Sequence, residues 1–93
     1  MRFALGQIAV TPSAAQALQR AGQVPEEFLD RHARGDWGDL TEAEKEENDR
    51  GLAEGIHVRF LSIYPLKTQE TIWVFTDLRQ NKTTVMLADE QLR

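Results

Sequence analysis

The chain has 93 residues, of which 41% are hydrophobic and 28% are charged; it carries a formal net charge of -4 and contains no cysteine. A chain of this length folds as one domain with a modest core, and the missing cysteines exclude disulfides and thiolate metal sites. Because no apolar run approaches the roughly 20 residues that cross a bilayer, and residues 1–10 lack a signal-peptide pattern, we expect a cytoplasmic protein without a membrane partner.

The first part of the chain predicts a short strand followed by two helices. The strand covers residues 7–10. A threonine and a proline at 11–12 are typical of a helix start, because threonine caps free amides and proline loses no hydrogen bond at the first helical position. Gly22 is the expected end of this helix. Pro25 begins a second, short helix that is expected to end at Gly35.

An acidic third helix follows, beginning at Thr41 and ending at Gly55. Thr41 with Glu44 matches a capping box, in which each side chain satisfies an amide near the other. The middle of this helix is almost entirely polar, so we expect it to lie on the surface. Residues 26–54 carry eleven acidic and four basic side chains, whereas the segments on either side are slightly basic. Such a segment repels nucleic acid and attracts a basic surface.

Three closely spaced strands are predicted in the second half, at residues 58–64, 71–76 and 83–87. Their alternating apolar residues and short links are typical of an antiparallel meander. The strand at 71–76 is apolar on both faces, so we expect it at the centre of the sheet. The outer edge of the strand at Thr83 and Thr84 is expected to be free, which offers a route to a homodimer.

These elements predict a single domain over residues 1–93, in which residues 1–55 supply a strand and three helices and residues 56–93 supply the meander. The expected fold class is α+β with the order β-α-α-α-β-β-β. The helices are expected to pack on one face of a small, mostly antiparallel sheet that ends in the three-stranded meander.

Several segments carry a resemblance to a known family. In chain order they are Leu5-Gly6-Gln7-Ile8, Thr11-Pro12, Gly35-Asp36-Trp37-Gly38-Asp39-Leu40, Glu47-Asn48, Leu61-Ser62 with Tyr64, Ile72-Trp73-Val74 and Thr83-Thr84-Val85. Over nearly its whole length the chain resembles a family of small uncharacterised bacterial proteins found on plasmids, phages and other mobile elements, often called plasmid-related proteins and sometimes mislabelled as type I restriction subunits. The resemblance implies an accessory role in mobile elements, directed against host defence, and it brings no catalytic residues. The chain departs from the family pattern at residues 77–82 and 88–90.

The loop around Trp37 is the first candidate site. A tryptophan between Asp36 and Asp39, with flexible glycines beside it, could grip a ligand or a partner, because tryptophan is enriched at binding hot spots. Alternatively, Trp37 fills the core while the two aspartates make turn and capping hydrogen bonds.

His32 with Asp36 and Asp39 is the second candidate site. A histidine near two carboxylates could act as a general base or help to bind a metal, which would make the chain a small hydrolase or a metal-dependent enzyme. The spacing matches no metal-binding motif. The alternative is a histidine that lies half-buried beside Phe28.

Two surfaces complete the candidates. Carboxylates on the rigid third helix can imitate the spacing of DNA phosphates, or they form a solvated face that keeps the protein soluble. The meander could bind single-stranded nucleic acid through aromatic and basic side chains, unless the aromatic rings form the core. The residues of this second surface are Arg59, Lys67, Arg79 and Lys82 with Tyr64, Trp73 and Phe75.

The leading hypothesis from the sequence is a non-enzymatic, small acidic binding protein of mobile-element type. It would act, without a cofactor or a metal, on a basic protein surface of a host restriction or CRISPR complex. Its partner-binding residues would be Asp36, Trp37, Asp39, Glu42, Glu44, Glu46, Glu47 and Asp49. Single-strand nucleic-acid binding by the meander, and a small enzyme around His32, are the alternatives.

Overall fold

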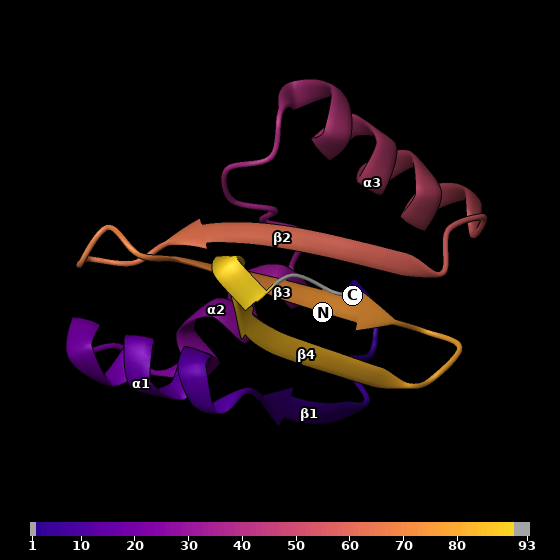
Figure 1. Ribbon diagram of the computed structural model, residues 1–93. Coiled ribbons are helices and arrows are strands. Elements are labelled where there is room, and N and C mark those ends of the chain that lie inside the picture. Colours follow the sequence, from indigo (N-terminus) through magenta and orange to yellow (C-terminus); the bar gives the residue numbers. More distant parts are fainter. Residues whose placement is uncertain (1, 91–93) are drawn as a thin grey trace.

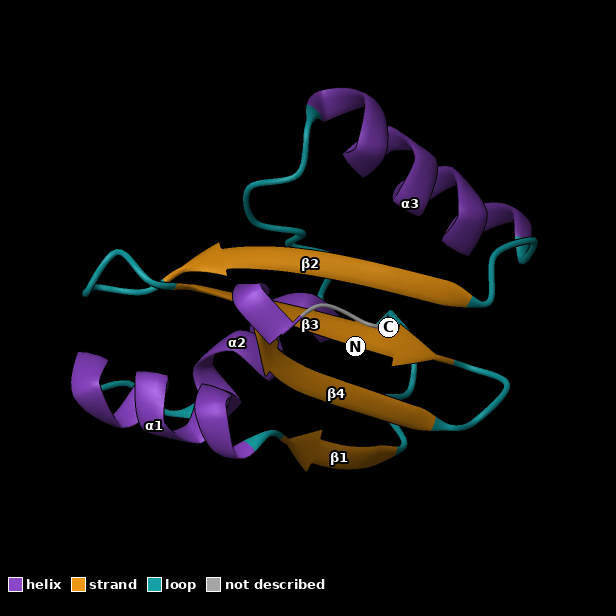
Figure 2. Cartoon of the chain, in the orientation of Figure 1, coloured by secondary structure: helices purple, strands orange, loops and turns teal. Residues whose placement is uncertain are grey.

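The computed structural model of the chain describes residues 2–90. The elements in chain order are β1 (Gln7–Val10), α1 (Pro12–Ala21), α2 (Pro25–Ala33), α3 (Glu42–Glu54), β2 (Arg59–Pro65), β3 (Thr71–Asp77), β4 (Lys82–Leu87) and the short 3-10 helix η1 (Ala88–Glu90) (Figures 1 and 2). This is the predicted order of helices and strands. Within residues 2–90, no helix combines the length and the apolar character that crossing a membrane requires.

The first and third helices begin and end at the residues that the capping signals predict. The hydroxyl of Thr11 accepts a hydrogen bond from the N–H of Ala14, and Gly22 ends α1 in the left-handed conformation. Both halves of the capping box are present in α3: the hydroxyl of Thr41 accepts from the N–H of Glu44, and the Glu44 carboxylate accepts from the N–H of Thr41. The helix is therefore held at its start by its own side chains.

β1 converts the predicted meander into a mixed sheet. The strand order is β1-β4-β3-β2, with β2–β3 and β3–β4 antiparallel and β1 parallel to β4. The prediction of a mostly antiparallel sheet with a free edge at Thr83 and Thr84 is therefore wrong, because Ile8 and Ala9 of β1 lie beside these two residues. The long connection through three helices and two strands lets β1 run in the same direction as β4.

The two faces of the sheet have different covers. α1 and α2 pack on one face, where Leu18 and Phe28 join Tyr64, Ile72 and Val74 in the main core. The opposite face carries no α-helix in the described part of the chain, and η1 crosses part of it in front of β3 (Figure 1). The half-buried apolar side chains of this helix-free face are Leu61, Ile63, Trp73 and Phe75. α3 lies beyond β2 rather than over the face that α1 and α2 cover.

The outer edge of β2 is closed by α3 and by the loop that precedes it. The N–H of Ile63 donates to the Trp37 carbonyl at 3.2 Å, and the Ile63 carbonyl accepts from the N–H of Asp39 at 2.7 Å. Asn48 of α3 donates its side-chain N–H to the Leu61 carbonyl at 3.2 Å. These bonds satisfy backbone groups that an edge strand would otherwise leave open.

At Gly38 the backbone of this loop lies against β2, where it forms a parallel bridge with Ile63. Its φ is +72°, and a Cβ at this position would collide with the backbone carbonyl of Ile63.

Gly22 is a matched control, because its φ is +68° and a Cβ there would meet nothing within 4 Å. We expect Gly22→Ala to lower the free energy of unfolding by about 1 kcal/mol, the cost of a left-handed alanine. Gly38→Ala should cost about 1–3 kcal/mol more, because the added atom also displaces the loop. Urea unfolding measures both losses, and equal losses would contradict the close contact between loop and strand.

Candidate functional site

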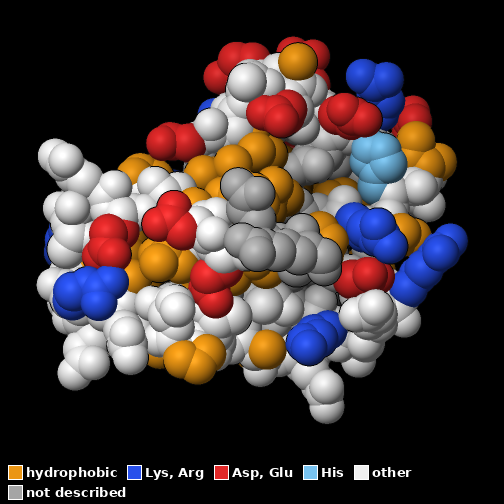
Figure 3. All heavy atoms as spheres, in the orientation of Figure 1, with side chains coloured by type: hydrophobic (Ala, Val, Ile, Leu, Met, Phe, Trp, Pro, Cys, Tyr) orange, Lys and Arg blue, Asp and Glu red, His pale blue; other side chains and the backbone are white. Residues whose placement is uncertain are grey.

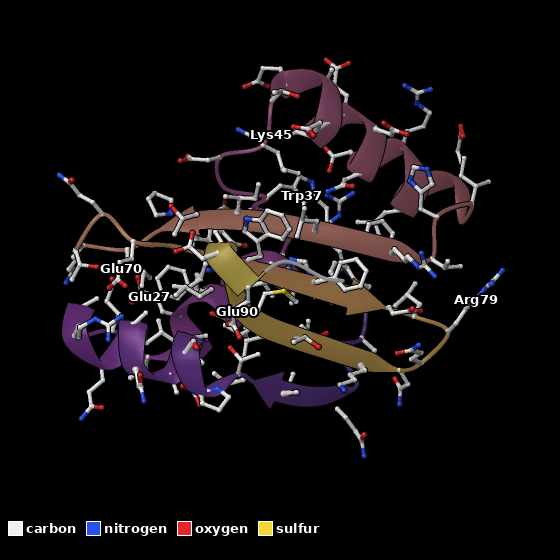
Figure 4. All side chains as sticks on the ribbon, viewed as in Figure 1. Glu27, Trp37, Lys45, Glu70, Arg79 and Glu90 are labelled. Carbon is white, nitrogen blue, oxygen red and sulfur yellow. The ribbon has the colours of Figure 1, made fainter. Side chains whose placement is uncertain are left out.

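Trp37 lies in the core rather than on the surface. It is 2% exposed and stacks with Phe3 and Phe60 at ring-centroid distances of 6.0 and 5.9 Å. Its indole Nε1 donates a hydrogen bond to the Asp49 carboxylate of α3 at 3.0 Å, so Trp37 connects α3 to the sheet (Figure 4). Of the two interpretations of the loop, the tryptophan that fills the core describes this position. The ring is not available to grip a partner there.

The two aspartates of the loop are exposed, and one of them is already engaged. Asp36 accepts hydrogen bonds from the Arg31 guanidinium at 2.7 Å and from the N–H of Gly38 at 3.2 Å. Arg31 is the main reason that the pKa of Asp36 is lowered from its usual value. The Asp36 carbonyl also accepts the hydroxyl proton of Tyr64 at 2.6 Å. Asp36 therefore stabilises the turn, while the carboxylate of Asp39 lies at the surface.

His32 is fully buried in a chain of hydroxyl groups. The Thr83 hydroxyl donates to the Leu5 carbonyl at 2.6 Å, and because a carbonyl only accepts, Thr83 must receive the proton of Thr76, 2.6 Å away. Thr76 then accepts from Nε2 of His32 at 2.9 Å, which leaves Nδ1 to accept from the Ser62 hydroxyl at 2.5 Å. This chain assigns the neutral Nε2–H tautomer to His32.

The structure does not bring His32 together with Asp36 and Asp39. Both ring nitrogens are occupied by Ser62 and Thr76, and burial lowers the pKa of His32 to about 4. Ser62 beside a histidine resembles a nucleophile with its base, but both residues are 0% exposed and no substrate can reach them. Among residues 2–90, no three His, Asp or Glu side chains are grouped to hold a metal, and no buried side-chain nitrogen or oxygen lacks a partner.

Some acidic residues of α3 hold the helix in place. Glu44 closes the capping box, and Asp49 accepts from Trp37 and, at 2.8 Å, from Arg2. These hydrogen bonds lower the pKa of both carboxyls, through Thr41 for Glu44 and through Trp37 and then Arg2 for Asp49. These two predicted partner-binding residues are therefore engaged within the chain.

Other acidic residues border a hollow beside α3. The hollow has a volume of about 500 Å³ and is lined by Ala43, Glu46, Glu47, Arg50, Ile56 and His57; we call it the acidic hollow. Ile56 is 61% exposed at its border. Glu42, another predicted site residue of α3, is not part of this lining, and its carboxylate lies 3.7 Å from the Lys45 ammonium. Figure 3 shows acidic side chains gathered over α3, with a histidine between them and a group of basic side chains.

The histidine at this border is His57, which brings α3 close to the start of β2. Its ring packs against Gly51, where any side chain would collide with it. Its Nε2 lies 3.9 Å from the Glu47 carboxylate, and its ring meets Phe60 edge-on at 6.4 Å. The missing side chain at Gly51 therefore makes room for the His57 ring, which lines the acidic hollow.

A second hollow, with a volume of about 410 Å³, shares Ile56 and His57 with the first. Its remaining lining residues are Val58, Arg59 and Arg79; we call it the basic hollow. The sheet register places Arg59, Asp77 and Lys82 side by side at this end. Asp77 is only 8% exposed, so the cations dominate the surface, and Arg79 points away from the β3–β4 turn (Figure 4).

Sequence reasoning missed the two hollows, although one signal was present. Gly55 ends α3, and the N–H of Ile56 donates to the Gly51 carbonyl at 3.1 Å, as in a Schellman motif. An apolar residue at this position usually packs back on the last turn of its helix. Ile56 is exposed instead, so its apolar side chain leaves a hydrophobic area on the surface that another molecule could cover.

No family model, no curated protein and no solved structure matches the chain. These comparisons therefore assign no family and no function to the chain. The accessible features of the described residues include the acidic hollow, the basic hollow and the helix-free face of the sheet.

The burial of neutral His32 makes stability depend on pH. Its pKa is about 4 when folded against 6.5 as the ordinary value, so the folded chain binds fewer protons between these pH values. The contribution of neutral His32 to the free energy of unfolding is fully present above pH 6.5. It is lost as the pH falls toward 4, and the total loss is about 3 kcal/mol. Urea unfolding over this pH range measures the loss.

The control for this prediction is His32→Gln, which removes the titrating group. The variant should be less stable at neutral pH, because it disturbs hydrogen bonds to Ser62 and Thr76. Its stability should nevertheless vary much less between pH 6.5 and 4 than that of the natural chain. The same pH slope in both proteins would show that other groups cause the loss.

Proposed function

We propose that the chain is a small, non-enzymatic acidic binding protein whose docking surface is the acidic hollow with the exposed face of α3. The observation that carries this proposal is the exposed Ile56 beside Glu46 and Glu47 in one hollow. Glu46 has no ion pair or side-chain hydrogen bond within residues 2–90 and is free to meet an external cation.

The chemistry of this hollow suits a lysine or arginine of a protein partner. The aliphatic stem of such a side chain can cover Ile56 while its charged end meets Glu46 or Glu47. Charge complementarity of this kind speeds association and sets orientation, and the apolar contact adds affinity. Glu42 and Asp39 are further exposed carboxylates that extend the acidic surface.

Rigidity of α3 supports the proposal. Asp49 is bonded to Trp37 and Arg2, and Asn48 is bonded to Leu61, so the helix presents its free carboxylates in one arrangement. A preorganised surface loses less entropy on binding than a mobile one. Trp37 thus has a positioning role in this proposal.

The resemblance to proteins of mobile elements narrows the partner that we propose. A basic groove that normally holds nucleic acid, in a cytoplasmic host restriction or CRISPR complex, would attract carboxylates fixed on a helix. In this proposal the chain occupies such a groove and inhibits the complex. No step of bond making or breaking is required.

The proposal predicts that reversing the charge of the acidic hollow abolishes binding. Glu46→Lys combined with Glu47→Lys should weaken capture of the host partner from lysate at least about tenfold, because attraction becomes repulsion. Glu26→Lys combined with Glu27→Lys makes the same change in net charge on α2, away from α3 (Figure 4). That control should retain the partner. Equal capture by both double variants would sink the proposal.

The helix-free face of the sheet favours one second candidate, single-strand nucleic-acid binding. Trp73 and Phe75 are half-buried on this face, and Arg59 and Lys82 lie at the same end of their strands. Aromatic rings on an open sheet beside cations can stack and neutralise a single strand. Tyr64 is fully buried on the opposite face, so it takes no part in this surface.

Tryptophan fluorescence distinguishes the two candidates. A single-stranded oligonucleotide at low salt should leave the tryptophan emission of the chain unchanged if the protein partner is correct. Strong quenching that is lost in Arg79→Glu combined with Lys82→Glu would favour the nucleic-acid candidate instead.

A further inference from the structure

One edge of the sheet is covered by other parts of the chain, and the other edge is open. The outer edge of β2 is closed by hydrogen bonds to the loop before α3 and to Asn48. β1 forms the other edge, and no element of the described chain lies beyond it (Figure 1). A sheet with one closed and one open edge can extend in one direction only.

Alternation along β1 identifies its open backbone groups. The N–H of Gln7 donates to the Asn81 carbonyl at 2.8 Å, and the N–H of Thr11 donates to the Val85 carbonyl at 3.0 Å. The backbone N–H and C=O groups of the odd-numbered residues of β1 therefore point toward β4. Those of Ile8 and Val10 point away from the sheet. Within residues 2–90 these outward groups have no hydrogen-bond partner.

This edge also lacks the usual protection. Natural proteins blunt an open edge with lysine, proline or a bulge. β1 reads Gln-Ile-Ala-Val, contains no charge and no proline, and pairs with β4 in unbroken register. Ile8 is 45% exposed on it. An uncharged strand of this kind is suited to another uncharged strand.

We propose that β1 pairs antiparallel with β1 of a second copy, which joins the two sheets into one continuous sheet about a two-fold axis. The edge is self-complementary in one register. With Ala9 on the axis, Ile8 of each copy lies opposite Val10 of the other, and both outward N–H groups meet both outward C=O groups. The small side chain of Ala9 lets the copies approach at the axis. No like charges oppose each other, because β1 carries none.

The arrangement leaves the acidic hollow free. β2 and α3 lie at the opposite edge of each sheet from β1. The dimer therefore presents two acidic hollows at its far ends, which would give it two binding positions for one extended or repeated partner. The dimer itself does not depend on the proposed function, since its contacts are confined to β1.

Sedimentation across a concentration series tests the assembly. The natural chain should change from monomer to dimer with concentration. Ile8→Pro should remain monomeric yet stay folded, because proline removes an outward N–H that makes no bond within the chain. Ile8→Val, which keeps that N–H, should still dimerise. A natural chain that is monomeric throughout, or an Ile8→Pro variant that dimerises equally well, would overturn the proposal.

Cysteine cross-linking tests the register independently of any proline variant. The natural chain has no cysteine. Ala9→Cys would place two thiols across the axis in a non-hydrogen-bonded pair, where Cα atoms are about 4.5 Å apart and a disulfide can form. Gln7→Cys is the control, because its copies lie far from each other in this register. Oxidation should give a disulfide-linked dimer with Ala9→Cys only. Failure of Ala9→Cys to link, or its capture of a different protein instead of its copy, would refute the second copy as occupant.

Discussion

The hydrogen-bond chain through His32 is the interaction on which the rest of the fold depends. It begins at Ser62 in β2, passes through His32 of α2 to Thr76 and Thr83 in β3 and β4, and ends at the Leu5 carbonyl before β1. The four side chains of this network are fully buried, so each must find its partner inside the chain or leave a costly unsatisfied group. One chain of hydroxyls and an imidazole thus fixes a helix, three strands and the approach of a fourth. Its cost is sensitivity to acid, since the imidazole must stay neutral.

A second group of contacts turns a poorly amphipathic helix into a fixed surface. α3 buries only Gly51, and its carboxylates would otherwise favour solvent over packing. The indole of Trp37 and the guanidinium of Arg2 both bind Asp49, while Asn48 bonds to β2. The same acidic residues therefore serve two purposes according to where they point. Those toward the sheet attach the helix, and those away from it form the surface that we assign to a partner.

Sequence patterns predicted the features whose causes are local. Thr41 and Glu44 are three residues apart, so their capping box could be recognised without the fold. Apolar residues on both faces marked β3 as a central strand. The partner of β1 could not be found in this way, because β1 pairs with residues 82–85, near the other end of the chain. The predicted site at His32 was wrong for the same reason: its ring nitrogens bond to Ser62 and Thr76, which lie far from it in sequence. The sequence offered a core position for Trp37 as one of two interpretations, but not its hydrogen bond to Asp49 in the following helix.

The parallel pairing of β1 with β4 has a consequence for how the chain acquires its structure. It joins Ile8 to Thr83, near opposite ends of the sequence. Contacts of such separation raise contact order and slow folding. During synthesis, β1 and all three helices emerge before β4 exists, so their apolar faces stay exposed until the strand that completes the sheet has been made. β1 therefore cannot take its place in the sheet until β4 has been synthesised.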